Sequence, residues 1–181
     1  VIYNSDQVGI TGSQIANSGT IRFNSANPFN LTNSISGSGV IEQRGNGMLT
    51  VSGNNTLNGS IDIGGYALTL GSANALGSLG RVLSGGGCLT VANGVTLDHL
   101  TVNGAVNLLS TVNTTNDQTY NGALIFSSSG TPYDMANQTA AVPNFYSSLG
   151  NISFMSSVSA GAGSKNTQRS LVVKAANGTV L

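Results

Sequence analysis

The sequence contains very few charged residues. Of its 181 residues 7% are charged, and the six basic and six acidic side chains cancel to a formal net charge of zero, whereas an ordinary soluble domain has about 25% charged residues. The shortage of basic residues excludes the positive patch that a nucleic-acid-binding surface needs. Hydrophobic residues nevertheless make up 39% of the chain, so the composition favours a folded domain over a disordered one.

Several other features are absent. A single cysteine, Cys88, excludes an internal disulfide. The sequence has no run of about 18 apolar residues, so we expect no membrane-spanning helix. The N-terminus has no charged stretch followed by an apolar one, so we expect no signal peptide in this segment. Val1 lies within the strand pattern and residues 179–181 resemble the start of another strand, so we expect the chain to be a segment of a longer protein.

A Leu-Thr-Val/Leu tripeptide recurs along the middle of the chain. It occupies residues 49–51, 68–70 and 89–91, and a turn rich in Gly, Asn and Ser follows each copy. The copies begin about 19 to 21 residues apart. A repeat of about 20 residues, built from short strands, is typical of a solenoid in which each coil stacks on the previous one. Side chains alternate between the two faces of a strand, so we expect Leu49 and Val51 to face the interior and Thr50 the solvent.

Each repeat contains two further apolar patches, which in the first repeat are Val40-Ile41 and Leu57. Three patches per coil predict three strand-bearing faces around a roughly triangular cross-section. The sequence therefore predicts an all-β fold, a parallel β-helix of coils about 20 residues long that forms one domain over residues 1–181. We expect glycine and asparagine to supply the positive φ angles that tight corners need, at Gly53-Asn54, Gly64-Gly65, Asn93-Gly94 and Asn103-Gly104.

Residues 127–150 break this pattern. They contain two of the three prolines, and proline cannot donate to a sheet ladder. The segment is therefore expected to be a loop or an excursion from the solenoid. It either forms an exposed aromatic binding loop or folds its aromatic side chains back over a coil or a sheet edge. The candidate binding residues are Tyr133, Met135, Phe145 and Tyr146.

Two parts of the sequence resemble known bacterial repeats. Residues 37–78 contain a Gly-x-Gly opening, a Leu-Thr-Val-Ser-Gly-x-Asn-Thr centre and a Leu-Thr-Leu-Gly-x-Ala-Asn-Ala-Leu-Gly close. These elements resemble the passenger-associated repeats of bacterial autotransporters. Residues 116–123 are similar to repeats in exoproteins of the filamentous-haemagglutinin type. The resemblance implies a right-handed parallel β-helix that is exported through an outer-membrane pore, and it implies no catalytic residues.

Two acidic residues, Glu42 and Asp62, are the best candidates for enzymatic chemistry. They lie twenty residues apart and are expected to stack on neighbouring coils, and glycoside hydrolysis uses two carboxyl groups about 5–9.5 Å apart. The sequence shows no accompanying Lys/Arg cluster or aromatic sugar platform, which favours isolated surface acids instead.

The surroundings of the only histidine, His99, do not favour a catalytic role. Asp98 and His99 suggest part of a nucleophilic triad, but neighbouring residues of a strand face opposite sides, so we do not expect Asp98 to orient His99. The sequence has no second histidine and no acidic cluster, which argues against a zinc or calcium site. We therefore expect no catalytic residue, no metal and no cofactor.

These observations favour a structural and adhesive role at the bacterial cell surface or outside the cell. The expected partners are a host cell-surface or matrix protein, a glycan, or another copy of the protein in cell–cell aggregation or biofilm. Nucleic acid is not an expected partner. The alternatives are a carbohydrate-active β-helix enzyme, acting as a lyase or hydrolase, and a pure spacer or export scaffold.

Overall fold

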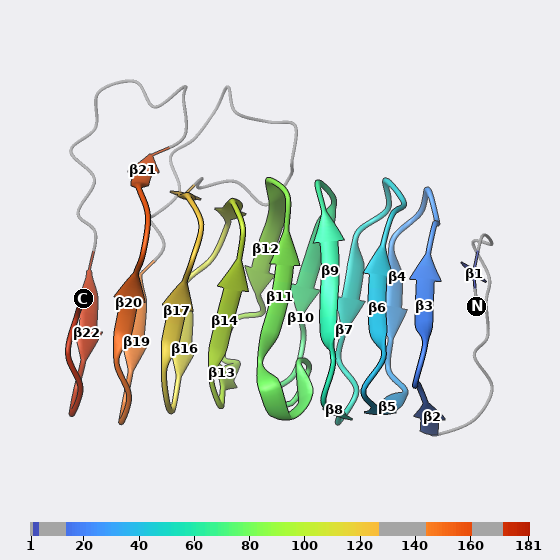
Figure 1. Ribbon diagram of the computed structural model, residues 1–181, viewed down its shortest axis with the longest axis horizontal. Coiled ribbons are helices and arrows are strands. Elements are labelled where there is room, and N and C mark those ends of the chain that lie inside the picture. The colour runs from blue at the N-terminus through green and yellow to red at the C-terminus, as the bar shows by residue number, and fades with distance from the viewer. Residues whose placement is uncertain (1, 4–13, 127–143, 161–171) are drawn as a thin grey trace.

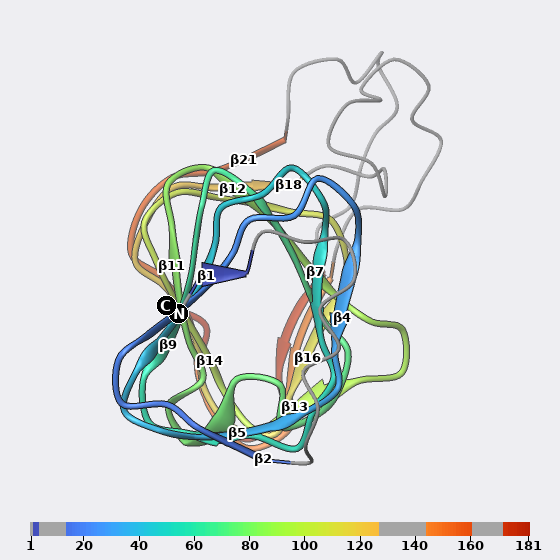
Figure 2. The same ribbon diagram turned by 90° about the vertical axis from the view of Figure 1, so that its right-hand side faces the viewer.

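The chain winds around one long axis as a parallel β-solenoid. The computed structural model describes residues 2–3, 14–126, 144–160 and 172–181. In Figure 1 successive coils follow one another from the N-terminal to the C-terminal end. Figure 2 looks along the axis from the N-terminal end, and each coil runs clockwise as it recedes. This sense is right-handed, so the predicted parallel β-helix is confirmed.

The strands form four sheets in which every neighbouring pair is parallel. Sheet 1 has eight strands: β1 (Ile2–Tyr3), β3 (Thr20–Phe23), β6 (Val40–Gln43), β9 (Ser60–Gly64), β11 (Arg81–Ser84), β14 (Leu100–Asn103), β17 (Gln118–Tyr120) and β20 (Ile152–Phe154). Sheet 2 has seven: β4 (Phe29–Leu31), β7 (Leu49–Val51), β10 (Ala67–Leu70), β12 (Gly87–Val91), β15 (Val106–Leu108), β18 (Leu124–Phe126) and β21 (Val158–Ala160).

The third face of the solenoid is divided between two sheets. Sheet 3 contains β2 (Gln14–Ala16), β5 (Ser34–Gly37) and β8 (Thr56–Leu57). Sheet 4 contains β13 (Thr96–Leu97), β16 (Val112–Thr114), β19 (Phe145–Ser147) and β22 (Val173–Ala175). Between them the coil forms a short 3-10 helix, η1 (Gly77–Leu79), instead of a strand. The prediction of three faces is therefore right, but the third is not one continuous sheet.

The recurring tripeptides stack in register, as the sequence predicts. Leu68 of β10 is paired with Leu49 of β7 and with Leu89 of β12. All three leucines are buried, whereas the threonines that follow them form a half-buried row on the outer face. Because each inner side chain lies on its counterpart in the next coil, the apolar rows fill the interior along the axis.

Aromatic side chains replace the aliphatic rows toward the C-terminal end. The ring centroid of Tyr120 lies 5.5 Å from those of Phe145 and Phe154. Phe145 is fully buried, because β19 turns its first and third residues inward and Tyr146 outward. The prediction that Phe145 belongs to an exposed binding loop is therefore wrong. Tyr133 and Met135 lie outside the described residues.

Glycine serves two different purposes at the corners. Gly64, Gly94 and Gly104 have φ angles of 50°, 79° and 91°, as predicted for their corners. At the Gly53-Asn54 corner, Gly53 itself is not among the glycines with positive φ. Instead, a Cβ atom at Gly53 would lie 2.0 Å from the carbonyl oxygen of Asn33 in the preceding coil. Gly53 is thus required by the close approach of two coils.

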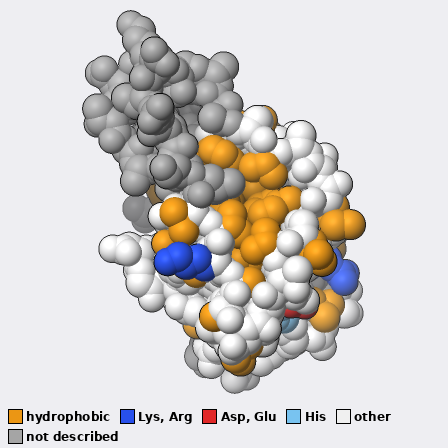
Figure 3. All heavy atoms as spheres, turned by 90° about the vertical axis from the view of Figure 1, so that its left-hand side faces the viewer, with side chains coloured by type: hydrophobic (Ala, Val, Ile, Leu, Met, Phe, Trp, Pro, Cys, Tyr) orange, Lys and Arg blue, Asp and Glu red, His pale blue; other side chains and the backbone are white. Residues whose placement is uncertain are grey.

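The C-terminal end of the solenoid exposes apolar side chains (Figure 3). Met155, Val180 and Leu181 are each between 47% and 68% exposed. Phe154 and Val173 are partly buried and pack against the core. A terminal coil is covered on one side only, which explains why core-type residues reach solvent here.

One corner is held by a buried asparagine whose role the sequence pattern did not indicate. The side-chain oxygen of Asn55 accepts a hydrogen bond of 2.8 Å from the backbone N–H of Ile35, and its amide nitrogen donates one of 2.7 Å to the carbonyl of Ala75. Asn55 is 4% exposed, so its side chain links the coils before and after its own.

Replacing Asn55 is expected to destabilise the solenoid. Asn55→Ala leaves a buried N–H and a buried carbonyl without partners, which costs about 2–4 kcal/mol of unfolding free energy. The adjacent Asn54 is exposed, and Asn54→Ala should change stability by less than about 0.5 kcal/mol. Urea unfolding followed by circular dichroism measures both variants, and equal midpoints would contradict the assigned role.

Candidate functional site

Four charged residues form a ladder on the outer face of sheet 1. Arg22, Glu42 and Asp62 occupy equivalent positions on β3, β6 and β9, and Arg44 follows β6. Arg22 Nε lies 2.6 Å from Glu42 Oε2. Arg44 Nη2 lies 2.6 Å from Asp62 Oδ2 and 3.6 Å from Glu42 Oε1. The hydrogen bond to Asp62 raises the pKa of Arg44 above its ordinary value.

The two carboxylates that the sequence offers as a catalytic pair, Glu42 and Asp62, both belong to this ladder. Glu42 and Asp62 stack on neighbouring coils, as predicted. The expectation that no basic residues accompany them is wrong. Arg22 contacts Glu42 from the equivalent position of the preceding coil, and Arg44, which follows β6, contacts Asp62. The guanidinium of Arg44 lies within salt-bridge distance of both carboxylates, which offsets the repulsion between the stacked Glu42 and Asp62. The arrangement ties three coils together by ion pairs.

Asp98 and His99 are closer together than the sequence suggested. His99 Nδ1 lies 3.0 Å from Asp98 Oδ2, because both residues lie between β13 and β14 at a corner, where strand alternation does not apply. The hydrogen bond from His99 lowers the pKa of Asp98, and the amide of Asn116 adds a second bond. The other side of the His99 ring packs against Gly80, where a Cβ atom would lie 2.9 Å from Nε2.

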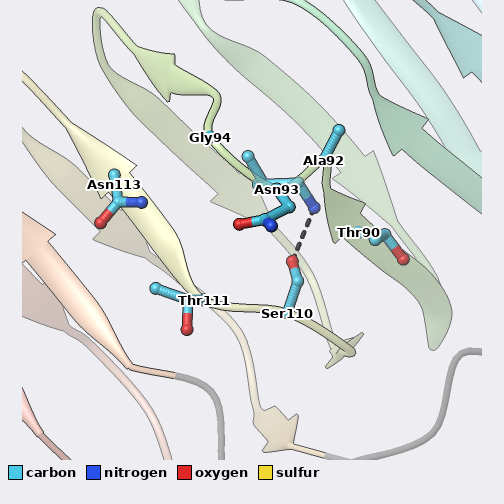
Figure 4. A pocket seen from close by; sticks show the side chains of 8 residues that line it. Thr90, Ala92, Asn93, Gly94, Ser110, Thr111 and Asn113 are labelled. Carbon is cyan, nitrogen blue, oxygen red and sulfur yellow. Dashed lines mark hydrogen bonds between the residues drawn. The ribbon is translucent and has the colours of Figure 1, made fainter.

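A shallow groove runs along the outer surface where sheet 2 turns into sheet 4. Its first hollow has a volume of about 440 Å³ and lies beside the corner that follows β12. Figure 4 shows the side chains of Asn93, Ser110 and Thr111 around it. Ser110 Oγ accepts a 2.7 Å hydrogen bond from the backbone N–H of Val91, where the ladder between the strands ends. The lining carries no charge and combines polar side chains with the apolar Val91 and Ala92.

A second hollow, of about 470 Å³, continues the first on the outer face of sheet 4. Asn113 lines both hollows. We call the two together the axial groove. Four residues in register form a single row along its second part, namely Thr96, Asn113, Tyr146 and Lys174. Tyr146, one of the predicted binding residues, thus lies in the groove, whereas Phe145 lies beneath it in the core.

Lys174 gives the groove its charge. Among the described residues that line the two hollows it is the only charged one. Its Nζ lies 6.0 Å from the centroid of the Tyr146 ring, at the outer limit of a cation–π contact. No carboxylate of the described part of the chain lies within salt-bridge distance of it. Among the described residues, no acid therefore compensates the positive charge of the groove.

A buried polar network supports the floor of the groove. Gln118 is fully buried, and its side-chain amide donates a 2.7 Å hydrogen bond to the carbonyl of Tyr146 and one of 3.1 Å to Thr114 Oγ1. The Gln118 oxygen accepts a 3.2 Å bond from the Tyr120 hydroxyl. The pKa of that hydroxyl is raised strongly by its complete burial. These bonds fix the backbone from which Tyr146 projects.

Comparison with known proteins gives no relative. The chain matches no known protein family, no curated protein and no solved structure. Within the described ranges there is also no helix long and apolar enough to cross a membrane. Those same ranges contain no cluster of three or more potential metal-ligating His, Cys, Asp or Glu residues. The function is therefore argued from the surface of this chain.

Removing the central cation of the charge ladder is expected to weaken the N-terminal coils. Arg44→Gln leaves Glu42 and Asp62 stacked without the guanidinium between them, which should lower the unfolding free energy by about 1–2 kcal/mol, and more at low salt than at high salt. Urea unfolding at low and high ionic strength measures the effect.

Arg81→Gln is the matched control, because Arg81 is exposed on the same sheet face and pairs with no described carboxylate. It should change stability by less than about 0.5 kcal/mol. Equal, salt-independent effects of the two substitutions would contradict the ladder as a stabilising element.

Proposed function

We propose that this chain is a structural and adhesive segment of a secreted bacterial cell-surface protein. The observation that carries the proposal is the in-register stacking of neutral polar side chains on the outer faces. Thr50, Thr69 and Thr90 form one such row. Elsewhere Asn121 donates a 2.8 Å hydrogen bond to Asn103, and Asn74 one of 2.7 Å to Asn54. A partner with a repeating structure can meet the same chemistry on successive coils.

Such a surface suits adhesion better than catalysis. The apolar rows occupy the interior, and the hollows described above lie on the outer surface. The best candidate pair of carboxylates is engaged by Arg44 and Arg22. Individual contacts through hydroxyl and amide groups are weak, about 0.5–1.5 kcal/mol each. Many of them along a stiff rod, or on many rods presented together, add up to strong attachment.

The resemblance of residues 37–78 and 116–123 to secreted bacterial repeats supports the bacterial surface as the place of action. The partner is a host surface or matrix molecule, or a second rod of the same kind. A spacer without binding activity would share the fold and differ only in having no partner.

Multivalent presentation tests the proposal. The purified chain coupled densely to beads is expected to bind host cells, matrix components or bacteria that display the same chain, while the monovalent chain binds about 10²–10⁴-fold more weakly. Beads that carry the heat-unfolded chain are the control. If the folded chain at high density binds none of these surfaces, the adhesive function is wrong and the chain is a spacer.

A further inference from the structure

We propose that the axial groove binds an acidic oligosaccharide, a glycan chain with carboxylate groups of the uronic-acid type that lies parallel to the solenoid axis. This inference rests on the proposed adhesive function and names its ligand class. It starts from the row formed by Thr96, Asn113, Tyr146 and Lys174, whose members occupy equivalent positions on four successive strands of sheet 4.

The spacing of the row suits a polysaccharide. Parallel strands lie about 4.8 Å apart, so the row spans about 14 Å. One strand spacing is close to the length of a single sugar unit in an extended chain of pyranose rings. A glycan aligned with the axis can therefore place successive sugar units over Asn113, Tyr146 and Lys174.

The side chains of the row match the chemical groups of a sugar. Tyr146 is half-buried and faces outward from β19, and its ring can pack against the apolar C–H face of a pyranose. Asn113 offers both hydrogen-bond donors and an acceptor, and Thr96 offers a hydroxyl, which suits the vicinal hydroxyl groups of a sugar. Gln118 fixes the backbone of Tyr146 from below, so the platform is already formed before the ligand binds.

The charge of the groove selects an acidic ligand. Lys174 has no carboxylate partner within the described ranges, and the described residues that line the groove include no acid. An ammonium group is a compact, strongly hydrated charge that pairs with one carboxylate at a time. Its place at one end of the row, beside the Tyr146 ring, favours a sugar unit with a carboxylate next to a unit stacked on the tyrosine.

An acidic peptide fits this groove less well. Extended peptides bind to sheets mainly by pairing their backbone with a free strand edge. The groove floor is instead the face of sheet 4, where the backbone groups of β16 and β19 already bond to neighbouring strands. What remains for a ligand is a row of hydroxyl, amide, aromatic and ammonium groups.

Calorimetric titration tests the inference. The probes are a tetrasaccharide of a hexuronic acid, its carboxyl-reduced neutral counterpart and an oligoglutamate peptide. The folded chain is expected to bind the uronate at least tenfold more tightly than the other two probes, with an affinity that falls as salt rises. Lys174→Gln should weaken uronate binding about tenfold and bring it to the level of the neutral sugar. Tyr146→Ala should weaken both sugars.

Two control variants separate binding from folding. Tyr146→Phe keeps the ring and should keep binding, and Arg81→Gln removes a cation elsewhere and should leave affinity unchanged. Unchanged melting curves by circular dichroism establish that each variant folds. Equal binding of the acidic and neutral sugars, tighter binding of the peptide, or binding that Lys174→Gln does not alter would each overturn the inference.

The bead assay distinguishes this inference from the proposed function. Beads that carry the Lys174→Gln chain should lose attachment to surfaces rich in uronic acids. If wild-type beads adhere but the chain binds no uronate, the adhesive function stands and the groove assignment is wrong. If the chain binds uronate through Lys174 but the beads adhere to no surface, the adhesive function is wrong and the groove assignment stands.

Discussion

The structure depends on the in-register stacking of parallel strands. Backbone hydrogen bonds between coils place every side chain about 4.8 Å from its counterpart in the next coil. Inside, this brings leucine onto leucine and fills the interior. Outside, it penalises stacked like charges by about 1 kcal/mol per pair even in a water-like environment. The low charge of the chain follows from this. Where two acids do stack, at Glu42 and Asp62, the guanidinium of Arg44 lies within salt-bridge distance of both carboxylates.

The regular part of the fold can be predicted from the sequence, because two periodicities of the apolar residues determine it. A period of two gives the face of each strand residue, and a period of about 20 gives its neighbour in the next coil. The prediction fails where the second period changes. Asn113 and Tyr146 are stacked although they are 33 residues apart, so a period of about 20 residues does not predict β19, and the prolines of residues 127–150 indicate a loop instead. The alternation of Phe145, Tyr146 and Ser147 was the local signal that could have identified it as a strand.

The axial groove was out of reach of sequence reasoning for a related reason. The members of its row are 17, 33 and 28 residues apart, and no motif has such spacing. The sequence indicates Tyr146 as a candidate binding residue, but it does not indicate that Asn113 and Lys174 lie beside it. For Asp98 and His99 the prediction fails for another reason. The alternation of side chains in a strand does not hold at a corner, where the two side chains meet. At corners, and where the coil length departs from about 20 residues, periodicity therefore has no predictive value.

The polar contacts between particular coils also determine which coils pair with one another. A stack of identical layers has translational symmetry, so a coil shifted by one whole layer would make the same contacts and the chain could pair with the wrong neighbour without penalty. The ion pair of Arg44 with Asp62 joins two particular coils, and the hydrogen bonds of Asn55 join its own coil to the coils of Ile35 and Ala75. These contacts distinguish one coil from another along the solenoid axis. These polar contacts thus favour one register among the coils, in which each coil pairs with its own neighbours.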